Sequence, residues 1–507
     1  MNCRPSAAPA LAALISLACA AAISAQTAPV AVDGLYDDWQ DVSPAWTDPQ
    51  GDCASEGAVD FGGIWVHSNA ERMTIRFQIG AEMNLQGGNA IALLLDSDGD
   101  AATGRQAEGI GAEFEWTFGE RQGSTWSDDG EVVVEQHDVG LRQAPTVSST
   151  EFEISFLRKT GDGRALAAGP YVDLVLVAGE AGSADRLPDT AALRLQLSNK
   201  AATGPRPMSL ERGHPDDIRV VTWNVLFDGL FKRPAPFIRV LRALDPDVIC
   251  FQEIWAHTSQ QATDMVSLAL PGPTWYGAAS GEGHIVSRHP MLLERSIDES
   301  GNYWALVDLP DERYDVDLSI VSAHPPCCDK EEERQRELDG IAAWLRELQT
   351  PGGILEPTDE PPLEFDLVAG TPIVVAGDMN LVGGASQVRT LTDGQISDEA
   401  AFGPSHAADW DGTPLADAWP RVNGTGDVFT WRDARSSFSP GKLDYIVYSD
   451  SVLELKRAFS LETTGLTKDD LARYGLKADD TLEASDHLPV VADFTPAVSQ
   501  ARTKAGE

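Results

Sequence analysis

Between residues 30 and 197, apolar and polar side chains alternate in many short runs, which is the period of a β-strand. Gly, Asp and Asn separate the runs, and no long stretch has the 3.6-residue period of a helix. The clearest runs cover 64–66, 73–79, 91–95, 114–118, 152–156 and 171–177. Many short strands with turn residues between them predict an all-β sandwich over 30–197.

After residue 217 the pattern changes, because apolar runs of strand length now alternate with helical stretches. The expected strands are 218–223, 248–251, 283–287, 303–309, 316–322, 371–376, 428–431, 443–448 and 488–494. The expected helices are 235–243, 260–270 and 329–348. This order predicts an α/β domain over 217–497, joined to the sandwich by a Gly- and Pro-rich linker at 198–216 and followed by a tail at 498–507.

Polar side chains follow the strands of the α/β part. Asp378 and Asn380 come directly after the apolar run 371–376, and Gly377 lets the chain turn there. The other strand-end residues are Asn224, Glu253, His324, Asp444, Asp486 and His487. Each alone is explained as well by a helix cap, a turn or a solvated strand end. Together they predict one site at the ends of the strands.

The order of these short motifs is Thr-Trp-Asn, Gln-Glu, Ser-x-His, Gly-Asp-x-Asn, Leu-Asp-Tyr and Ser-Asp-His. It resembles the endonuclease/exonuclease/phosphatase superfamily, which includes pancreatic-type deoxyribonucleases, AP endonucleases, bacterial sphingomyelinases and inositol-polyphosphate 5-phosphatases. The resemblance covers about 217–497. It implies a four-layer α/β sandwich in which two packed mixed β-sheets lie between helices, and it implies hydrolysis of a phosphoester.

The resemblance also implies a metal centre. Glu253 is the expected main ligand, with Asn224 and Asp486 close by. Oxygen ligands of this kind suit Mg²⁺ or Mn²⁺. Some members of the superfamily carry an Asp two residues after the first Asn, and this chain has Leu226 there, which puts one contact around the metal in doubt.

The remaining roles follow from the same resemblance. His487 is the expected general base, and Asp444 holds its imidazole. Asp378 orients or deprotonates the water, and Asn380 donates to the charge that develops on phosphorus. His324 binds the phosphate or acts as an acid toward the leaving group, which favours the deoxyribonuclease, sphingomyelinase and phosphatase branches.

Charge narrows the choice of substrate. The chain has 38 Lys and Arg against 79 Asp and Glu, a net charge of −41. A broad basic face for nucleic acid is therefore excluded, although a narrow metal-filled cleft is not. We expect a metal-dependent phosphodiesterase or phosphatase that acts on a phosphoester substrate. The alternatives are an extracellular endonuclease and, in another class, a non-catalytic protein that binds sugars or surfaces.

Two motifs in the first half carry a second, weaker resemblance. The segment 32–39 opens the predicted sandwich, and an acidic segment at 96–104 follows one of its strands. They resemble the family-9-like and DOMON-like group of carbohydrate-binding sandwiches, which implies a carbohydrate or cell-surface ligand. The carboxylates of Asp96, Asp98 and Asp100 are equally consistent with a Ca²⁺ site or an acidic hairpin turn.

The first residues indicate export. Residues 1–25 read as a cleaved signal peptide, and no later stretch is long and apolar enough to span a membrane, so we expect a secreted or periplasmic protein. Cys250 lies in an apolar run and is expected to be a buried thiol. Cys327 and Cys328 are adjacent, and the sequence leaves a disulfide, a ligand pair and two thiols open.

Overall fold

The computed structural model describes residues 30–53, 58–179, 185–202, 204, 206–357 and 360–496. The predicted signal peptide at 1–25 and the predicted tail at 498–507 lie outside these ranges. None of the helices in the described part of the chain combines the length and the apolar composition needed to cross a bilayer.

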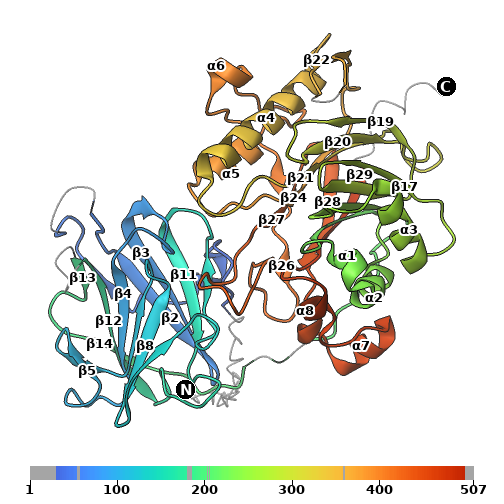
Figure 1. The fold of residues 1–507 in the computed structure, drawn as a ribbon. Coiled ribbons are helices and arrows are strands. Elements are labelled where there is room, and N and C mark those ends of the chain that lie inside the picture. Colours follow the sequence, from blue (N-terminus) through green and yellow to red (C-terminus); the bar gives the residue numbers. More distant parts are fainter. Residues whose placement is uncertain are drawn as a thin grey trace, which may run out of the picture.

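The first half of the chain forms two antiparallel sheets that pack face to face (Figure 1). The strands of one sheet are, in spatial order, β1 (Trp46–Thr47), β2 (Gly63–Ser68), β3 (Arg72–Met83), β11 (Ser149–Leu157) and β10 (Arg142–Ala144). Those of the other are β13 (Asp185–Leu187), β12 (Tyr171–Ala178), β4 (Ile91–Asp96), β7 (Phe114–Thr117), β8 (Gln122–Ser127) and β9 (Gly130–Val134), with β14 (Leu193–Gln196) also on β12. Rings from the two sheets meet between them, as Phe114 and Phe156 do at 5.6 Å.

Several aromatic side chains of this half fill its interior. Trp39, in the short 3₁₀ turn η1 (Asp37–Trp39), and Trp116 of β7 are 1% and 2% exposed. They are therefore not surface rings on which a sugar could stack. Trp46 is the exception, with 43% of its surface exposed.

In the acidic segment, for which the sequence left a Ca²⁺ site and an acidic hairpin turn open, only two of the three aspartates lie together. Asp96 and Asp98 form a group with Glu113, and Asp100 is not part of it. The Asp100 carboxylate instead accepts a hydrogen bond from the amide of Ala102, within the turn before the β5–β6 hairpin (Arg105–Ala107, Ile110–Ala112). The third aspartate, Asp100, therefore stabilises the local turn.

The second half contains two mixed sheets, which confirms the predicted architecture at this level. The first holds β17 (Tyr276–Ser280), β18 (Gly283–Ser287), β16 (Val248–Gln252), β15 (Ile218–Asn224), β29 (Val490–Pro496), β28 (Leu453–Ser460) and β26 (Arg421–Val422). The second holds β19 (Met291–Ser296), β20 (Tyr303–Val307), β21 (Leu318–Ala323), β24 (Ile373–Asp378), β27 (Asp444–Tyr448) and β25 (Ala416–Asp417). Val220 and Cys250 from one sheet and Ile320 and Val374 from the other share one buried core.

Helices cover the outer faces of both sheets (Figure 1). On the first sheet lie α2 (Pro234–Leu244) and α3 (Ser259–Ala269). On the second lie α4 (Glu331–Gln349) and α5 (Ser386–Asp393). The shorter elements are α1 (Gly229–Lys232), α6 (Glu399–Phe402), α7 (Lys468–Tyr474), α8 (Asp480–Ala484), η3 (Thr463–Gly465) and the hairpin β22–β23 (Ile354–Leu355, Leu363–Glu364).

One predicted strand is wrong. Residues 428–431 form no ladder, because their backbone groups bind separate segments: Val428 donates to Val32, Thr430 to Gly441, and Leu488 donates to Thr430. A strand needs one continuous partner. The Val428 bond, with the bond from the Val32 amide to Asp427 Oδ1 at 2.9 Å, forms a seam between the two halves of the chain.

Candidate active site

The sequence-predicted residues meet at one cleft of about 1310 Å³. Those that line it are Glu253, His324, Asp378, Asn380, Asp486 and His487. The other two, Asn224 and Asp444, lie beneath it with no exposed surface. The parallel pairs β15–β16 and β21–β24 bring this about, because the carboxyl ends of all four strands point to the same edge.

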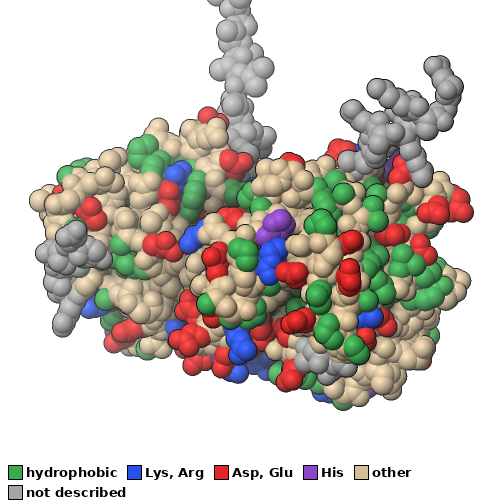
Figure 2. All heavy atoms as spheres, turned by 90° about the horizontal axis from the view of Figure 1, so that it is seen from above, with side chains coloured by type: hydrophobic (Ala, Val, Ile, Leu, Met, Phe, Trp, Pro, Cys, Tyr) green, Lys and Arg blue, Asp and Glu red, His purple; other side chains and the backbone are tan. Residues whose placement is uncertain are grey.

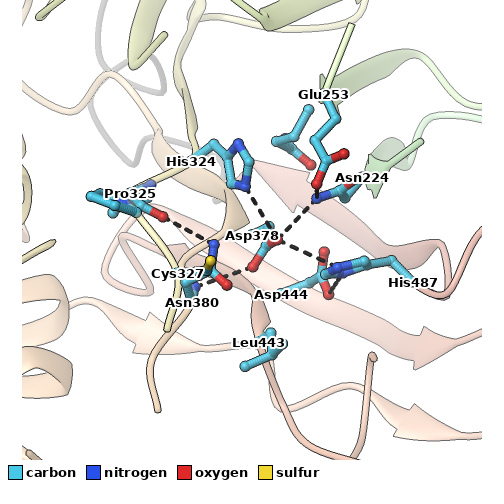
Figure 3. A network of polar contacts seen from close by, with 12 residues as sticks. Asn224, Glu253, His324, Pro325, Cys327, Asp378, Asn380, Leu443, Asp444 and His487 are labelled. Atoms are coloured by element: carbon cyan, nitrogen blue, oxygen red, sulfur yellow. Dashed lines mark hydrogen bonds and ion pairs between the residues drawn. The ribbon is translucent and has the colours of Figure 1, made fainter. Parts of the chain in front are cut away.

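Asp378 is at the centre of the site (Figure 3). Its Oδ2 accepts a hydrogen bond from Asn224 Nδ2 at 3.0 Å and lies 3.4 Å from His324 Nε2 and 3.5 Å from His487 Nε2. Its Oδ1 accepts from the amide of Asn380 at 3.1 Å. One carboxylate thus joins residues that come from four separate strand ends.

His487 is held from its other side by Asp444. The Nδ1 of His487 lies 2.8 Å from Asp444 Oδ2, and the pairing of β24 with β27 places Asp444 directly opposite Asp378. Burial opposes the charged form of the imidazole, but the Asp444 and Asp378 carboxylates outweigh it and raise the pKa of His487 to about 10. Nε2 is the imidazole nitrogen that faces the cleft side, toward Asp378.

His324 is also fixed between two carboxylates. Its Nδ1 lies 2.7 Å from Glu282 Oε1, while Nε2 faces Asp378. Burial disfavours the imidazolium, but these two carboxylates raise the pKa of His324 well above its usual value. His324 is therefore a cation at neutral pH.

Glu282 is a residue that the sequence analysis missed. It is 1% exposed, and besides His324 it binds the backbone amide of Glu253 through Oε2. It comes from the tight turn between β17 and β18, in Gly281-Glu282-Gly283. The available sequence signal was an acid between two glycines. It did not identify Glu282 as part of the site, because the partners of Glu282 are distant in the sequence.

Glu253 lines the cleft and is supported from below by Asn224. Asn224 Nδ2 donates to Glu253 Oε1 at 3.0 Å, and Glu253 Oε2 accepts from the amide of Phe227 at 2.8 Å. Leu226, Phe227 and Asp228 have φ values of 51°, 50° and 59°, and Glu253 has 65°. Residues other than glycine rarely adopt this left-handed backbone conformation. The backbone is therefore strained beside the predicted metal ligands Asn224 and Glu253.

The side chains at the cleft carry the oxygen ligands that a hard divalent cation prefers. Glu253, Asp378 and Asp486 offer carboxylate oxygens to one cleft, as Mg²⁺ and Mn²⁺ prefer. Asn224 Oδ1 accepts from the amide of Leu226 at 3.0 Å, so that oxygen already has a partner. Among the described residues, Asp378, Asp444 and His487 also form a compact group, with ligand atoms within 4.8 Å of one another.

The loop after His324 completes the floor. Asn380, in the left-handed region with φ 50°, donates from Nδ2 to the carbonyl of Pro325 at 3.0 Å. One hydrogen of its amide is thus used inside the protein. Cys327 and Cys328 form a disulfide that lines the cleft, which decides among the three states left open by the sequence. Cys250 is a buried thiol, as predicted.

The first half of the chain forms part of the cleft wall. Asn84, Gln86, Arg121 and Thr146 line it together with the predicted site residues. The guanidinium of Arg121 lies 4.2 Å from the centre of the Phe438 ring, and its Nε donates to Ser437 Oγ at 3.2 Å. The sandwich therefore contacts the loop that leads into Asp444.

The comparisons with known proteins concern the second half. No curated protein matches the chain. Similar solved structures include the catalytic domain of human Nocturnin with a bound sulfate (16% identity, 58% of this chain and 100% of that one, TM-score 0.36). An AP endonuclease from Archaeoglobus fulgidus is also similar, with 14% identity over 54% of this chain and 98% of that one and a TM-score of 0.34. So is sphingomyelinase C from Streptomyces griseocarneus, with 17% identity over 55% of this chain and 99% of that one and a TM-score of 0.28. The profile of the Endonuclease/Exonuclease/phosphatase family matches residues 221–487, more than half of the chain, and the chain therefore belongs to that family.

Proposed function

We propose that this protein is an exported, metal-dependent phosphoester hydrolase in which the His487–Asp444 pair activates water. The observation that carries the proposal is the Asp378 carboxylate, which contacts Asn224, His324 and His487 within 3.5 Å at the edge of a cleft. An Asp–His pair beside a second, cationic histidine is suited to proton transfer next to a bound phosphate. Residues 1–25, which read as a signal peptide, support export.

Each residue has a defined task in this reaction. Glu253, Asp486 and Asn224 would hold Mg²⁺ or Mn²⁺, which when bound polarises a phosphoryl oxygen, stabilises the leaving alkoxide and lowers the pKa of a neighbouring imidazole. His487 Nε2 accepts a proton from the attacking water, and Asp444 stabilises the resulting imidazolium through Nδ1.

Two further residues act on the phosphate. His324, protonated by its position between Glu282 and Asp378, donates to a phosphate oxygen or to the leaving group. Asn380 has a second amide hydrogen that Pro325 does not use, and this hydrogen can reach the charge that develops on phosphorus. Asp378 orients the water, because it already binds the base on one side.

The cleft favours a small substrate over a nucleic acid strand. Its wall carries many carboxylates, and Figure 2 shows acidic side chains over both halves with only scattered Lys and Arg on that face. Backbone phosphates of a long strand would meet these charges. Exposed rings at the cleft, with Phe227 at 60%, Trp255 at 59% and Phe438 at 43%, offer packing to an apolar or aromatic part of the substrate.

The first test is hydrolysis of bis-p-nitrophenyl phosphate with Mg²⁺ or Mn²⁺, and with EDTA. EDTA should abolish turnover, and His487→Ala and Glu253→Ala should each lower kcat by about 10³-fold or more, because each removes a group used in the transition state. His406→Ala and Glu454→Ala, which lie away from the cleft, are the matched controls. Unimpaired turnover by His487→Ala would contradict the mechanism.

A panel of sphingomyelin, phosphoinositides, nucleotides and plasmid DNA tests the substrate class under the same conditions. We expect cleavage of a small phosphoester and little cleavage of plasmid DNA. Rapid nicking of the plasmid would replace this reading with an extracellular endonuclease. Inactivity of the intact protein on every phosphoester would favour the non-catalytic binding protein.

A further inference from the structure

A second concentration of carboxylates lies in the first half of the chain, apart from the catalytic cleft. Oxygens of Asp48, Asp52 and Asp189 lie within 4.8 Å of one another, and so do oxygens of Asp52, Asp60 and Asp185. Asp52 belongs to both groups, so the five aspartates form a cluster of two linked groups. They come from the β1–β2 connection and from the segment at β13, which are far apart in the sequence.

Asp48 has no compensating partner for one of its oxygens. The side chain is 3% exposed, and Oδ1 accepts a hydrogen bond from Trp46 Nε1 at 3.2 Å. Its Oδ2 is sealed from solvent and has no hydrogen-bond partner among the described residues. A buried carboxylate oxygen in this state costs free energy unless a cation or a proton meets it.

The carboxylates near Asp48 further disfavour its charged form. Burial, together with the carboxylates of Asp189, Asp185 and Asp52, raises the pKa of Asp48 to about 7. No ion pair within the described residues joins a Lys or Arg to any of the five aspartates. The part of the chain that the structure describes therefore offers this cluster no ion pair with a Lys or Arg.

We propose that the five aspartates form a Ca²⁺ site that ties the β1–β2 connection to the β13 segment. Ca²⁺ takes six to eight oxygen ligands in a flexible arrangement, whereas Mg²⁺ requires a tighter octahedron. Carboxylates from two separate loops, each able to bind through one or two oxygens, match the first requirement. The site is independent of hydrolysis and of the function proposed above.

This cluster differs from the acidic turn that the sequence suggested. At that turn the carboxylates are used by the chain: Glu113 accepts from the Ser97 amide, Asp96 from the Gly99 amide and Asp98 from Thr103 Oγ1. Asp48 Oδ2 has no such bond. Asp60 and Asp185 also accept from backbone amides, those of Gly51, Phe61 and Arg186. The difference between the two places is therefore the buried Asp48 oxygen, which has no hydrogen-bond partner among the described residues.

Terbium luminescence tests the proposal, because Tb³⁺ replaces Ca²⁺ and emits after energy transfer from a nearby tryptophan. Trp46, bonded to Asp48, is the donor that the structure supplies. The full-length protein is used with Glu253→Gln, which weakens metal binding at the catalytic cleft. We expect saturable Tb³⁺ emission on tryptophan excitation, displacement by Ca²⁺, and loss of most of the emission in Trp46→Phe.

Aspartate variants in the same background assign the site. Asp52→Asn and Asp189→Asn, both at exposed positions that should not impair folding, are expected to weaken Ca²⁺ binding by at least about tenfold. They should also remove most of the rise in Tm that Ca²⁺ gives, since a ligand stabilises only the state that binds it. Asp98→Asn, in the acidic turn, is the matched control and should leave both readouts unchanged.

The outcomes are distinct. No Ca²⁺-displaceable emission and no rise in Tm, or the same response in Asp52→Asn as in the parent, would overturn the site. Loss of the response in Asp98→Asn alone would move it to the acidic turn and also overturn it. Neither readout measures turnover, so a failed hydrolase assay would not affect this result.

Discussion

His487 keeps a proton at neutral pH in the metal-free protein, because its pKa of about 10 lies far above that of an unfolded histidine. The folded state therefore binds one more proton than the unfolded state between about pH 6.5 and the folded pKa. The contribution of His487 to stability is complete below that window. It is lost as the pH rises through about 10.

We predict that Tm in EDTA falls more steeply from pH 7 to pH 9.5 in the parent than in His487→Gln. Lys442, whose pKa is lowered to about 8 mainly by burial, acts in the opposite direction, and comparison of the two proteins cancels it. Thermal unfolding at matched ionic strength measures the difference. Equal slopes would show that Asp444 and Asp378 do not hold the proton on His487.

Single residues also show what the sequence could predict. Asp378 and Asn380 follow an apolar run and His487 directly precedes one, so the local pattern identified them. Glu282 follows no such run, and its importance lies in contacts with Glu253 and His324 that only the fold creates. Local patterns report strand ends, whereas the residues that support a site depend on spatial neighbours.

At the scale of elements, the central strands β15 and β29 are joined by a buried ion pair. Arg219 and Asp493 are paired in register and are 1% and 0% exposed. Two parallel hydrogen bonds of 2.6 and 2.7 Å connect the guanidinium to the carboxylate. Removal of one member leaves the other buried without its counter-charge, which is costly.

We predict that Asp493→Asn lowers the free energy of unfolding by about 3–5 kcal/mol. Urea unfolding followed by tryptophan fluorescence gives the value. Glu211→Gln breaks the exposed pair with Arg473 and is the matched control, for which we expect no measurable change. A similar small effect in both variants would mean that this pair does not stabilise the sheet.

The elements themselves were predictable where the periodicity was long or the apolar run complete. The helix expected at 329–348 is α4, Glu331–Gln349, because its apolar stripe is continuous. The strand β28, Leu453–Ser460, was missed, since its exposed side chains include charged residues that dilute the pattern. The false strand at 428–431 had the composition of a strand, but its backbone bonds go to separate segments and not to one continuous strand.

At the scale of the whole molecule, the sandwich contacts the loops that carry the proposed catalytic residues. Gln86 Oε1 accepts from the amide of Ser439 at 2.8 Å and from its Oγ at 2.9 Å, shortly before Asp444. Ser148 exchanges two hydrogen bonds with the segment after Asn380, one with Gly383 and one with Ala385. Composition and motifs could not reveal these contacts, because they join side chains from separate domains.

We predict that Gln86→Ala lowers the free energy of unfolding by about 1–3 kcal/mol, since it leaves the Ser439 amide buried without a partner. It should also lower kcat/KM by about tenfold, because the loop before Asp444 loses its support. Urea unfolding measures the free energy, and steady-state kinetics measure kcat/KM. Gln122→Ala, at an exposed position on β8, is the control, and equal activity in the two variants would show that the sandwich does not support catalysis.

The seam at Val32 has a consequence for the order of assembly. The core of the sandwich draws only on residues between Val59 and Leu197, so it can close while later parts of the chain are still being synthesised. The contacts of Val32 form later, because its partners are Asp427 and Val428. Asp427 is synthesised 395 residues after Val32. Val32 is therefore among the last residues to reach its final contacts, although Asp33, Gly34 and Trp39 can bind Glu153 of the sandwich earlier.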